Sequence, residues 1–125
     1  MITMVTFTCA GEAYCIPVEC TRGVRMSAGI RAVPGAGADI AGVLPGEPAV
    51  TVLSVLGGGT HVLILELADL TFGLLVGTVT GLCLVDPGEI RAVVSAAHST
   101  VVSGTVQAGG ALAFVADPRA LAARL

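Results

Sequence analysis

The sequence predicts an all-β protein, and two observations carry this prediction. Short apolar segments recur at close spacing along the 125 residues, and several alternate apolar with polar positions, as strands with one buried face do. Glycine lies at most of the turns between them, a pattern typical of a barrel or a sandwich. Apolar residues make up 54% of the chain, which is enough for a core without disulfides or metals. No linker or clear internal repeat divides the chain, so we expect one domain over residues 1–125.

The N-terminal third predicts a hairpin followed by less regular chain. Residues 4–9 alternate apolar residues with threonine, and residues 14–18 form a second apolar segment after a glycine-containing turn. Residues 20–26 fit either a helical turn or a strand. Residues 28–34 lead into a loop rich in glycine and proline. Residues 38–43 predict a short helix.

The rest of the chain predicts further short strands and one terminal helix. Four apolar segments separated by turn residues are expected as strands: residues 49–56, 61–67, 71–76 and 78–85. A short segment follows at residues 90–94. Residues 99–107 and 111–115 predict a last hairpin around two glycines. The chain then ends in a short helix, which Asp117 is placed to cap and which Pro118 suits as first residue.

One apolar stretch has to be tested as a membrane span. Residues 70–85 carry no charge, but their 16 residues fall short of the roughly 20 that a helical span needs. Gly73, Gly77 and Gly81 have the four-residue spacing of packed membrane helices. Threonine, valine and phenylalanine within the same stretch favour two strands instead. The first eight residues lack a basic region and a long apolar run, so we expect no signal peptide and a cytoplasmic protein.

Charge and cysteine content exclude several function classes. The net charge is −3, and the basic residues are six scattered arginines that form no basic stripe, so nucleic-acid binding is not expected. The four cysteines form no CxxC pair, which argues against zinc ribbons and thioredoxin chemistry. We expect them to be reduced, buried and structural.

No catalytic constellation is visible in the sequence. His61 and His98 stand alone, without the spacing of a zinc site or a catalytic pair. The glycines of residues 57–59 lack the lysine of a phosphate-binding loop, and residues 35–39 lack the flanking strand and helix of a dinucleotide site. The sequence therefore predicts neither catalysis, nor a cofactor, nor a metal, and indicates a binding protein.

The order of several motifs resembles the CheW-like domain family. Residues 7–19, FTCAGEAYCIPVE, resemble the opening strands of that family, and TVLSVLG at residues 51–57 resembles a later one. Residues 61–82, HVLILELADLTFGLLVGTVTGL, and residues 101–125, VVSGTVQAGGALAFVADPRALAARL, resemble its central and closing segments. The resemblance extends from Phe7 to Leu121.

The resemblance implies two small, intertwined, five-stranded SH3-like β-barrels around a hydrophobic groove. It also implies a non-catalytic adaptor of chemotaxis-type signalling, which couples the helical tip of a chemoreceptor to the CheW-like regulatory domain of a CheA-type histidine kinase. The kinase interface is expected at Val24, Gly42, Pro45 and Gly46, and the receptor groove at Thr21, Gly73 and Leu82. No direct insertion into the membrane is implied.

The chain also departs from the family pattern at polar positions. An arginine of the family falls at Glu47 or near Pro45, and two aspartates fall near Ser54 and at Gly77. A valine expected in the groove falls at Thr21. Two alternatives therefore stay open: a degenerate barrel that binds a different protein or a small apolar ligand, and a cysteine- or metal-dependent enzyme.

Overall fold

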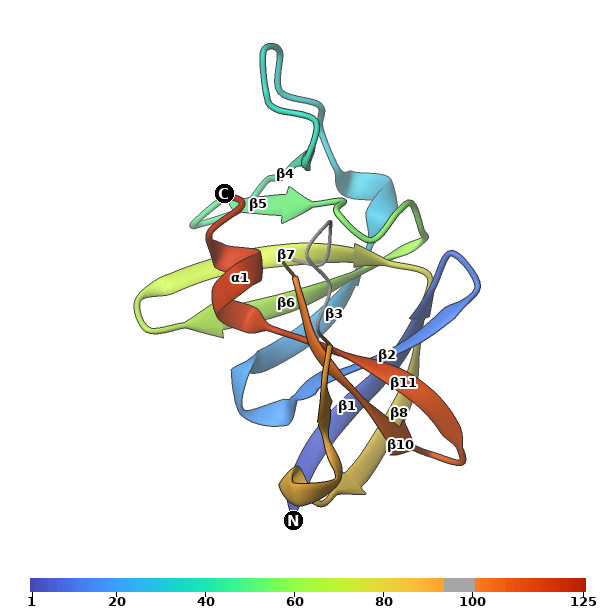
Figure 1. Cartoon of the computed structure of the whole chain (residues 1–125). Coiled ribbons are helices and arrows are strands. Elements are labelled where there is room, and N and C mark those ends of the chain that lie inside the picture. Colours follow the sequence, from blue (N-terminus) through green and yellow to red (C-terminus); the bar gives the residue numbers. More distant parts are fainter. Residues whose placement is uncertain (94–100) are drawn as a thin grey trace.

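The computed structural model describes residues 1–93 and 101–125 (Figure 1). It contains eleven strands, three 3-10 turns and one α-helix within those residues. The first strands are β1 (Ile2–Cys9), β2 (Glu12–Pro17), β3 (Thr21–Met26), β4 (Ile40–Leu44), β5 (Val50–Leu53) and β6 (His61–Leu67). The others are β7 (Leu70–Val76), β8 (Thr78–Val85), β9 (Arg91–Ala92), β10 (Val102–Ala108) and β11 (Ala111–Ala116), and the helix is α1 (Pro118–Ala122).

The strands form two sheets, which confirms the predicted all-β fold with SH3-like barrels. One sheet has the order β8-β1-β2-β11-β10-β9 and the other the order β3-β6-β7-β5-β4. The chain builds the first sheet from both of its ends and the second from its middle, so the two units are intertwined (Figure 1). The sixth strand of the first sheet, β9, is only two residues long.

The two sheets repeat one arrangement that the sequence does not reveal. Strands β8, β1, β2, β11 and β10 of the first sheet correspond in order to β3, β6, β7, β5 and β4 of the second. Each sheet contains one parallel pair at the corresponding place, β11 with β2 and β5 with β7. In each sheet, a 3-10 turn is followed by an isoleucine and an arginine. The backbone of that arginine pairs with the next strand, Arg91 with β10 and Arg31 with β4.

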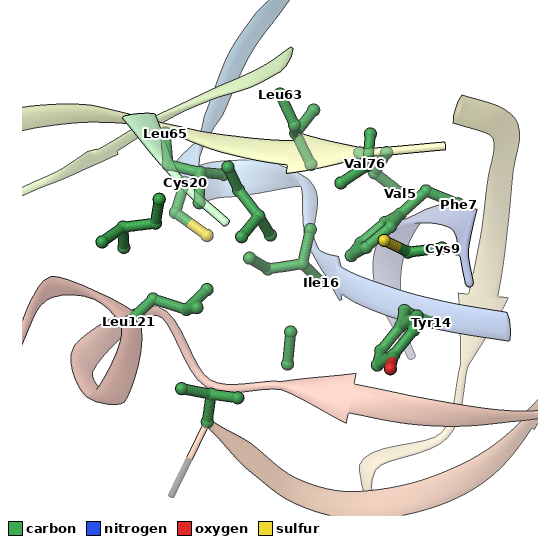
Figure 2. Packing of buried hydrophobic residues seen from close by; sticks show 14 of the residues in the cluster. Val5, Phe7, Cys9, Tyr14, Ile16, Cys20, Leu63, Leu65, Val76 and Leu121 are labelled. Carbon is green, nitrogen blue, oxygen red and sulfur yellow. The ribbon is translucent and has the colours of Figure 1, made fainter. Parts of the chain in front are cut away.

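The main core lies where the two sheets meet. Val5, Phe7, Tyr14 and Ile16 of the first sheet face Leu63, Leu65 and Val76 of the second (Figure 2). Phe72 of the second sheet belongs to the same cluster. Leu121 of α1 is fully buried in the same cluster, so the C-terminal helix helps to join the sheets. The rings of Phe7 and Tyr14 are stacked with centroids 5.5 Å apart. This shared apolar core fixes the position of one sheet relative to the other.

Local signals explain the ends of several elements. Ala10 and Gly11 both have positive φ, 51° and 81°, as the tight turn between β1 and β2 requires. The Asp117 carboxylate accepts a hydrogen bond from the Arg119 N–H at 3.0 Å, and Pro118 is the first residue of α1, which confirms the predicted cap. Among the described residues, no helix is long and apolar enough to span a bilayer.

The predicted helix at residues 38–43 is wrong. Residues 38 and 39 form a turn, and the rest of the segment belongs to strand β4, which pairs with β5 and, through the backbone of Val43, with Arg31. Its small and apolar residues fit either conformation locally, and the two neighbouring backbones decide the outcome. The ambiguous residues 20–26 form the end of a 3-10 turn and then β3. The segments expected at 90–94 and 99–107 extend partly outside the described residues.

Candidate interaction groove

An apolar groove of about 250 Å³ opens where the two sheets meet. Strands β1, β3, β6 and β8 and the turn after β2 supply its walls. The lining residues are Val5, Val18, Thr21, Gly23, Val24, Leu63, Val79, Gly81 and Leu82. The Thr21 hydroxyl donates a 2.8 Å hydrogen bond to the Val18 carbonyl oxygen, so the only polar side chain of the lining is already satisfied. The groove therefore offers an apolar surface without a charge.

A β-bulge shapes each of the two strands that flank the groove. In β3, Thr21 pairs with Leu65 and Gly23 with Ile64, so Arg22 is an extra residue. In β8, Val79 and Gly81 pair with consecutive residues of β1, so Thr80 is the extra residue. A bulge increases the local twist and redirects the side chains that follow it. The two bulges lie at corresponding places in the two sheets and are each followed by a glycine.

The residues after the bulges are exposed above a buried floor. Val24 and Leu82 expose 45% and 64% of their surface, whereas Val5 and Leu63 beneath them are buried. Val24 pairs across the strands with Leu63, and Leu82 with Val5, so the two halves of the groove repeat the same apolar pair. Exposed apolar side chains gathered around a groove are typical of a surface that a partner covers.

The structure brings together some of the predicted site residues. Thr21 and Leu82, expected in the receptor groove, both line it, and so does Val24, expected at the kinase interface. Gly73 does not reach the groove. It is buried in β7, where an added Cβ would lie 2.6 Å from Val62 Cγ1.

The other predicted interface residues lie at a different strand. Gly42 is buried within β4, and Pro45 and Gly46 follow β4 as exposed residues of the connection to β5. Val24 lines the groove, whereas Gly42, Pro45 and Gly46 are not among its lining residues.

Gly42 has a structural role that the sequence does not show. Its φ is 151°, and an added Cβ would overlap the carbonyl oxygen of Arg31. That close approach accompanies two backbone hydrogen bonds, from the Arg31 N–H to Val43 O at 2.9 Å and from the Val43 N–H to Arg31 O at 2.8 Å. Gly42 therefore allows the chain after β3 to close against β4.

Several groove residues were missed by the sequence analysis: Val5, Val18, Gly23, Leu63, Val79 and Gly81. The sequence contains a weak signal for these residues, which is the similarity between residues 21–26, TRGVRM, and residues 79–84, VTGLCL. Each has a glycine at its third position, followed by a large apolar residue. The similarity is too short to identify without knowing that β3 and β8 occupy corresponding places.

Packing explains some of the positions at which this chain lacks a polar residue of the family pattern. An added Cβ at Gly77 would lie 2.8 Å from the Thr8 carbonyl oxygen, which also accepts the Gly77 N–H at 2.8 Å, so no side chain fits there. The Ser54 N–H donates to Asp39 O and fixes the turn after β5. Glu47 is exposed beside Pro45 and makes the loop after β4 acidic instead of basic.

No catalytic arrangement is found in the part of the chain that the structure describes. His61 Nδ1 lies 2.9 Å from Gly77 O and 2.9 Å from Thr60 Oγ1, so this ring has a structural hydrogen bond. No three histidine, cysteine or carboxylate side chains come together as metal ligands within residues 1–93 and 101–125. His98 lies outside the described residues.

A polar depression of about 480 Å³ lies between the turn after β2 and the start of α1. Its charged side chains are Glu19, Arg22, Glu66, Asp117 and Arg119. Arg22 Nε lies 3.5 Å from a Glu66 carboxylate oxygen, and its Nη1 donates to the Glu19 carbonyl oxygen at 2.7 Å. Asp117 caps the helix, so Arg22, Glu66 and Asp117 all make contacts within the protein.

The cysteines make stability depend on pH in the alkaline range. Cys9, Cys15 and Cys20 are buried, and burial raises the pKa of Cys15 from 9.0 to about 11. Below pH 9 the thiol is neutral in both states, but between pH 9 and 11 only the unfolded chain ionises it. We expect the free energy of unfolding to fall across this window, as measured by urea unfolding at several pH values. Cys15→Ala should reduce the slope, and an unchanged slope would contradict the assignment to Cys15.

Comparison with known proteins agrees with this architecture. A family model described as the CheW-like domain matches residues 45–125. The fold is similar to that in the crystal structure of the scaffolding protein TtCheW from Thermoanaerobacter tengcongensis, with a TM-score of 0.83 and 18% sequence identity. That similarity covers 96% of this chain and 86% of the other. The search of curated proteins gives no match. Since the family model covers more than half of the chain, and the paired barrels agree with it, the chain belongs to the CheW-like domain family.

Proposed function

We propose that this protein is a non-catalytic adaptor of chemotaxis-type signalling in the cytoplasm, where it couples a chemoreceptor to a CheA-type histidine kinase. The observation that carries the proposal is the groove, which presents exposed Val24 and Leu82 above a buried floor and contains no charged side chain. Membership of the CheW-like family supports the same role, and the structurally similar TtCheW is described as a scaffolding protein.

The groove suits the apolar stripe of a helix from the receptor tip. A helix can place the side chains of one face between Val24 on one wall of the groove and Leu82 on the other. Pockets that bury a small molecule usually measure at least ~300 Å³ and enclose most of the ligand. At about 250 Å³ and open to solvent, this groove favours a helix over the alternative of a small apolar ligand.

The kinase domain is proposed to bind at the loop after β4, through Pro45 and Gly46. Both residues are exposed, and Gly42 supports the loop by allowing β4 to close against Arg31. Val24 is better assigned to the groove, because it lines that surface together with Thr21 and Leu82. The two partners would then occupy different surfaces, as an adaptor that bridges them requires.

The proposal predicts that binding of the receptor helix depends little on salt. Screening weakens exposed charge pairs but hardly affects apolar burial, and the groove lining has no charge. The measurement is isothermal titration calorimetry with a receptor-tip helical hairpin, and separately with the CheW-like domain of the kinase, at low and high salt. We expect less than about a threefold change in Kd for the hairpin.

Two outcomes would contradict this proposal. If the folded protein binds neither partner, the adaptor function is wrong and the degenerate barrel with another partner replaces it. If affinity falls steeply with salt, the contact depends on exposed arginines such as Arg22 and Arg25 instead of the groove. The kinase titration with Pro45→Asp, which alters an exposed loop residue, then tests the second surface independently.

A further inference from the structure

The β8 wall of the groove depends on the bulge at Thr80. Val79 and Gly81 pair with consecutive residues of β1, so Thr80 is an extra residue that has no pairing partner of its own. Nothing lies within 4 Å of a Cβ added at Gly81, and the φ of Gly81 is 152°, so packing at this glycine does not hold the backbone in place. The direction of Leu82, the next residue, is therefore set by whatever fixes the bulge.

A side-chain hydrogen bond joins the bulge to the neighbouring strand. The Thr80 hydroxyl donates to the Thr6 hydroxyl oxygen of β1, with the two oxygen atoms 2.8 Å apart. Successive side chains of a strand point to opposite faces of the sheet, and Val5 lines the groove, so Thr6 points away from it. Neither threonine is a lining residue of the groove. The bond can therefore hold the bulge against β1 without touching a molecule bound in the groove.

The corresponding bulge of β3 is also held by a side chain, with different chemistry. Arg22 is the extra residue there, and its Nη1 donates to the carbonyl oxygens of Glu19 and Thr21, at 2.7 Å and 3.0 Å. Its Nε lies 3.5 Å from a carboxylate oxygen of Glu66, which belongs to the paired strand β6. Arg22 lines the polar depression and not the groove. In both sheets, the extra residue of the bulge thus makes a polar side-chain contact outside the groove.

We propose that Thr80 and Thr6 form a positioning pair, whose hydrogen bond fixes the bulge of β8 and thereby the direction of Leu82 in the groove wall. The proposal rests on the function assigned to the groove, because it concerns how the receptor helix is bound. Leu82 exposes 64% of its surface, so its place depends on the backbone before it more than on packing. A wall that is ordered before binding spares the complex the entropy cost of ordering it.

The binding test compares variants that differ by one hydroxyl group. Thr80→Val keeps the branched side chain and removes the donor, so we expect the Kd for the receptor-tip hairpin to rise about fivefold, with little change in the free energy of unfolding. Thr80→Ser keeps the hydroxyl and should restore the wild-type Kd. The matched control is Thr78→Val, since Thr78 is an exposed threonine of the same strand whose hydroxyl makes no hydrogen bond within residues 1–93 and 101–125. That control should bind the hairpin as the wild type does.

A second test uses the free protein and needs no partner. In methyl NMR spectra, the signals of Leu82 should shift or broaden in Thr80→Val and in Thr6→Val, and should return to their wild-type positions in Thr80→Ser. The signals of Leu63, which is buried beneath the other wall, should not change. The double variant Thr6→Val/Thr80→Val should bind the hairpin no more weakly than either single variant, because both substitutions remove the same bond.

Three results would overturn the positioning role: Leu82 signals that do not respond to Thr80→Val, a hairpin Kd that Thr80→Val leaves unchanged while the wild type binds, or losses of affinity that add in the double variant. If the wild type does not bind the hairpin, the adaptor function fails, and the methyl spectra still decide whether the hydroxyl pair positions Leu82. Failure of the positioning role and failure of the proposed function are therefore distinguishable.

Discussion

Leu82→Asp should weaken binding of the receptor helix strongly while leaving the fold intact. Leu82 exposes 64% of its surface in the free protein, so aspartate at this position remains solvated and costs little stability. In the complex the same carboxylate would be buried against an apolar helix, where no charged group of the groove lining can pair with it. We expect a loss of at least about 2 kcal/mol, or roughly 30-fold in Kd, measured by calorimetry with the hairpin.

The chain offers a matched control for that experiment. Leu112 exposes a similar 62% of its surface but lines a separate depression near Gly88 and Gln107. Leu112→Asp introduces the same charge at the same exposure and should bind the hairpin as the wild type does. If both substitutions weaken binding equally, net charge and not the groove decides affinity. If Leu82→Asp binds normally, the receptor helix docks elsewhere.

Gly42→Ala should destabilise the protein by roughly 3 kcal/mol, because two costs combine at this position. The φ of 151° is strained for any residue with a Cβ, and that Cβ would also overlap the Arg31 carbonyl oxygen. Relief of the overlap would separate Arg31 from β4 and open the second barrel. The measurement is the free energy of unfolding from urea denaturation, with circular dichroism as the probe.

Gly81→Ala separates the two costs. Its φ of 152° is nearly the same, but nothing lies within 4 Å of an added Cβ. We therefore expect a smaller loss of about 1 kcal/mol, from backbone strain alone. An equal loss of unfolding free energy in the two variants would show that the Arg31 backbone moves away from the added Cβ at little cost. Since Gly42→Ala acts through the fold, weaker kinase binding by that variant would not identify Gly42 as an interface residue.

Local rules made much of the fold predictable. The turn at Ala10 and Gly11, the alternation of apolar residues with threonine in residues 5–9 and the Asp117 cap each depend on a few neighbouring residues, and all three are present in the structure. The helix expected at residues 38–43 failed because a short run of small apolar residues carries no local preference strong enough to decide. Pairing with β5 and Arg31 decided it.

The groove also combines features that the sequence predicted with features that depend on contacts between distant strands. Motif order placed Thr21 and Leu82 in one groove, and both line it, but it also placed Gly73 there, which is buried under Val62. Val24 was expected at the kinase interface together with Gly42, and it lines the groove, after a bulge at Arg22 that changes the direction of the following side chains. Neither the bulge nor its counterpart at Thr80 can be inferred from the strand alone, since a bulge exists only relative to the partner strand.

By itself, the sequence determined that the chain is all-β, that its charge is unsuited to nucleic acid, and where the hairpin turns and the helix cap lie. These properties follow from composition, alternation and backbone preferences that act within a few residues. Only the tertiary structure decided that two barrels repeat one strand order and that two bulges flank one apolar groove. Those properties arise from pairings between distant segments, and their energies depend on which backbones and side chains meet after the chain has folded.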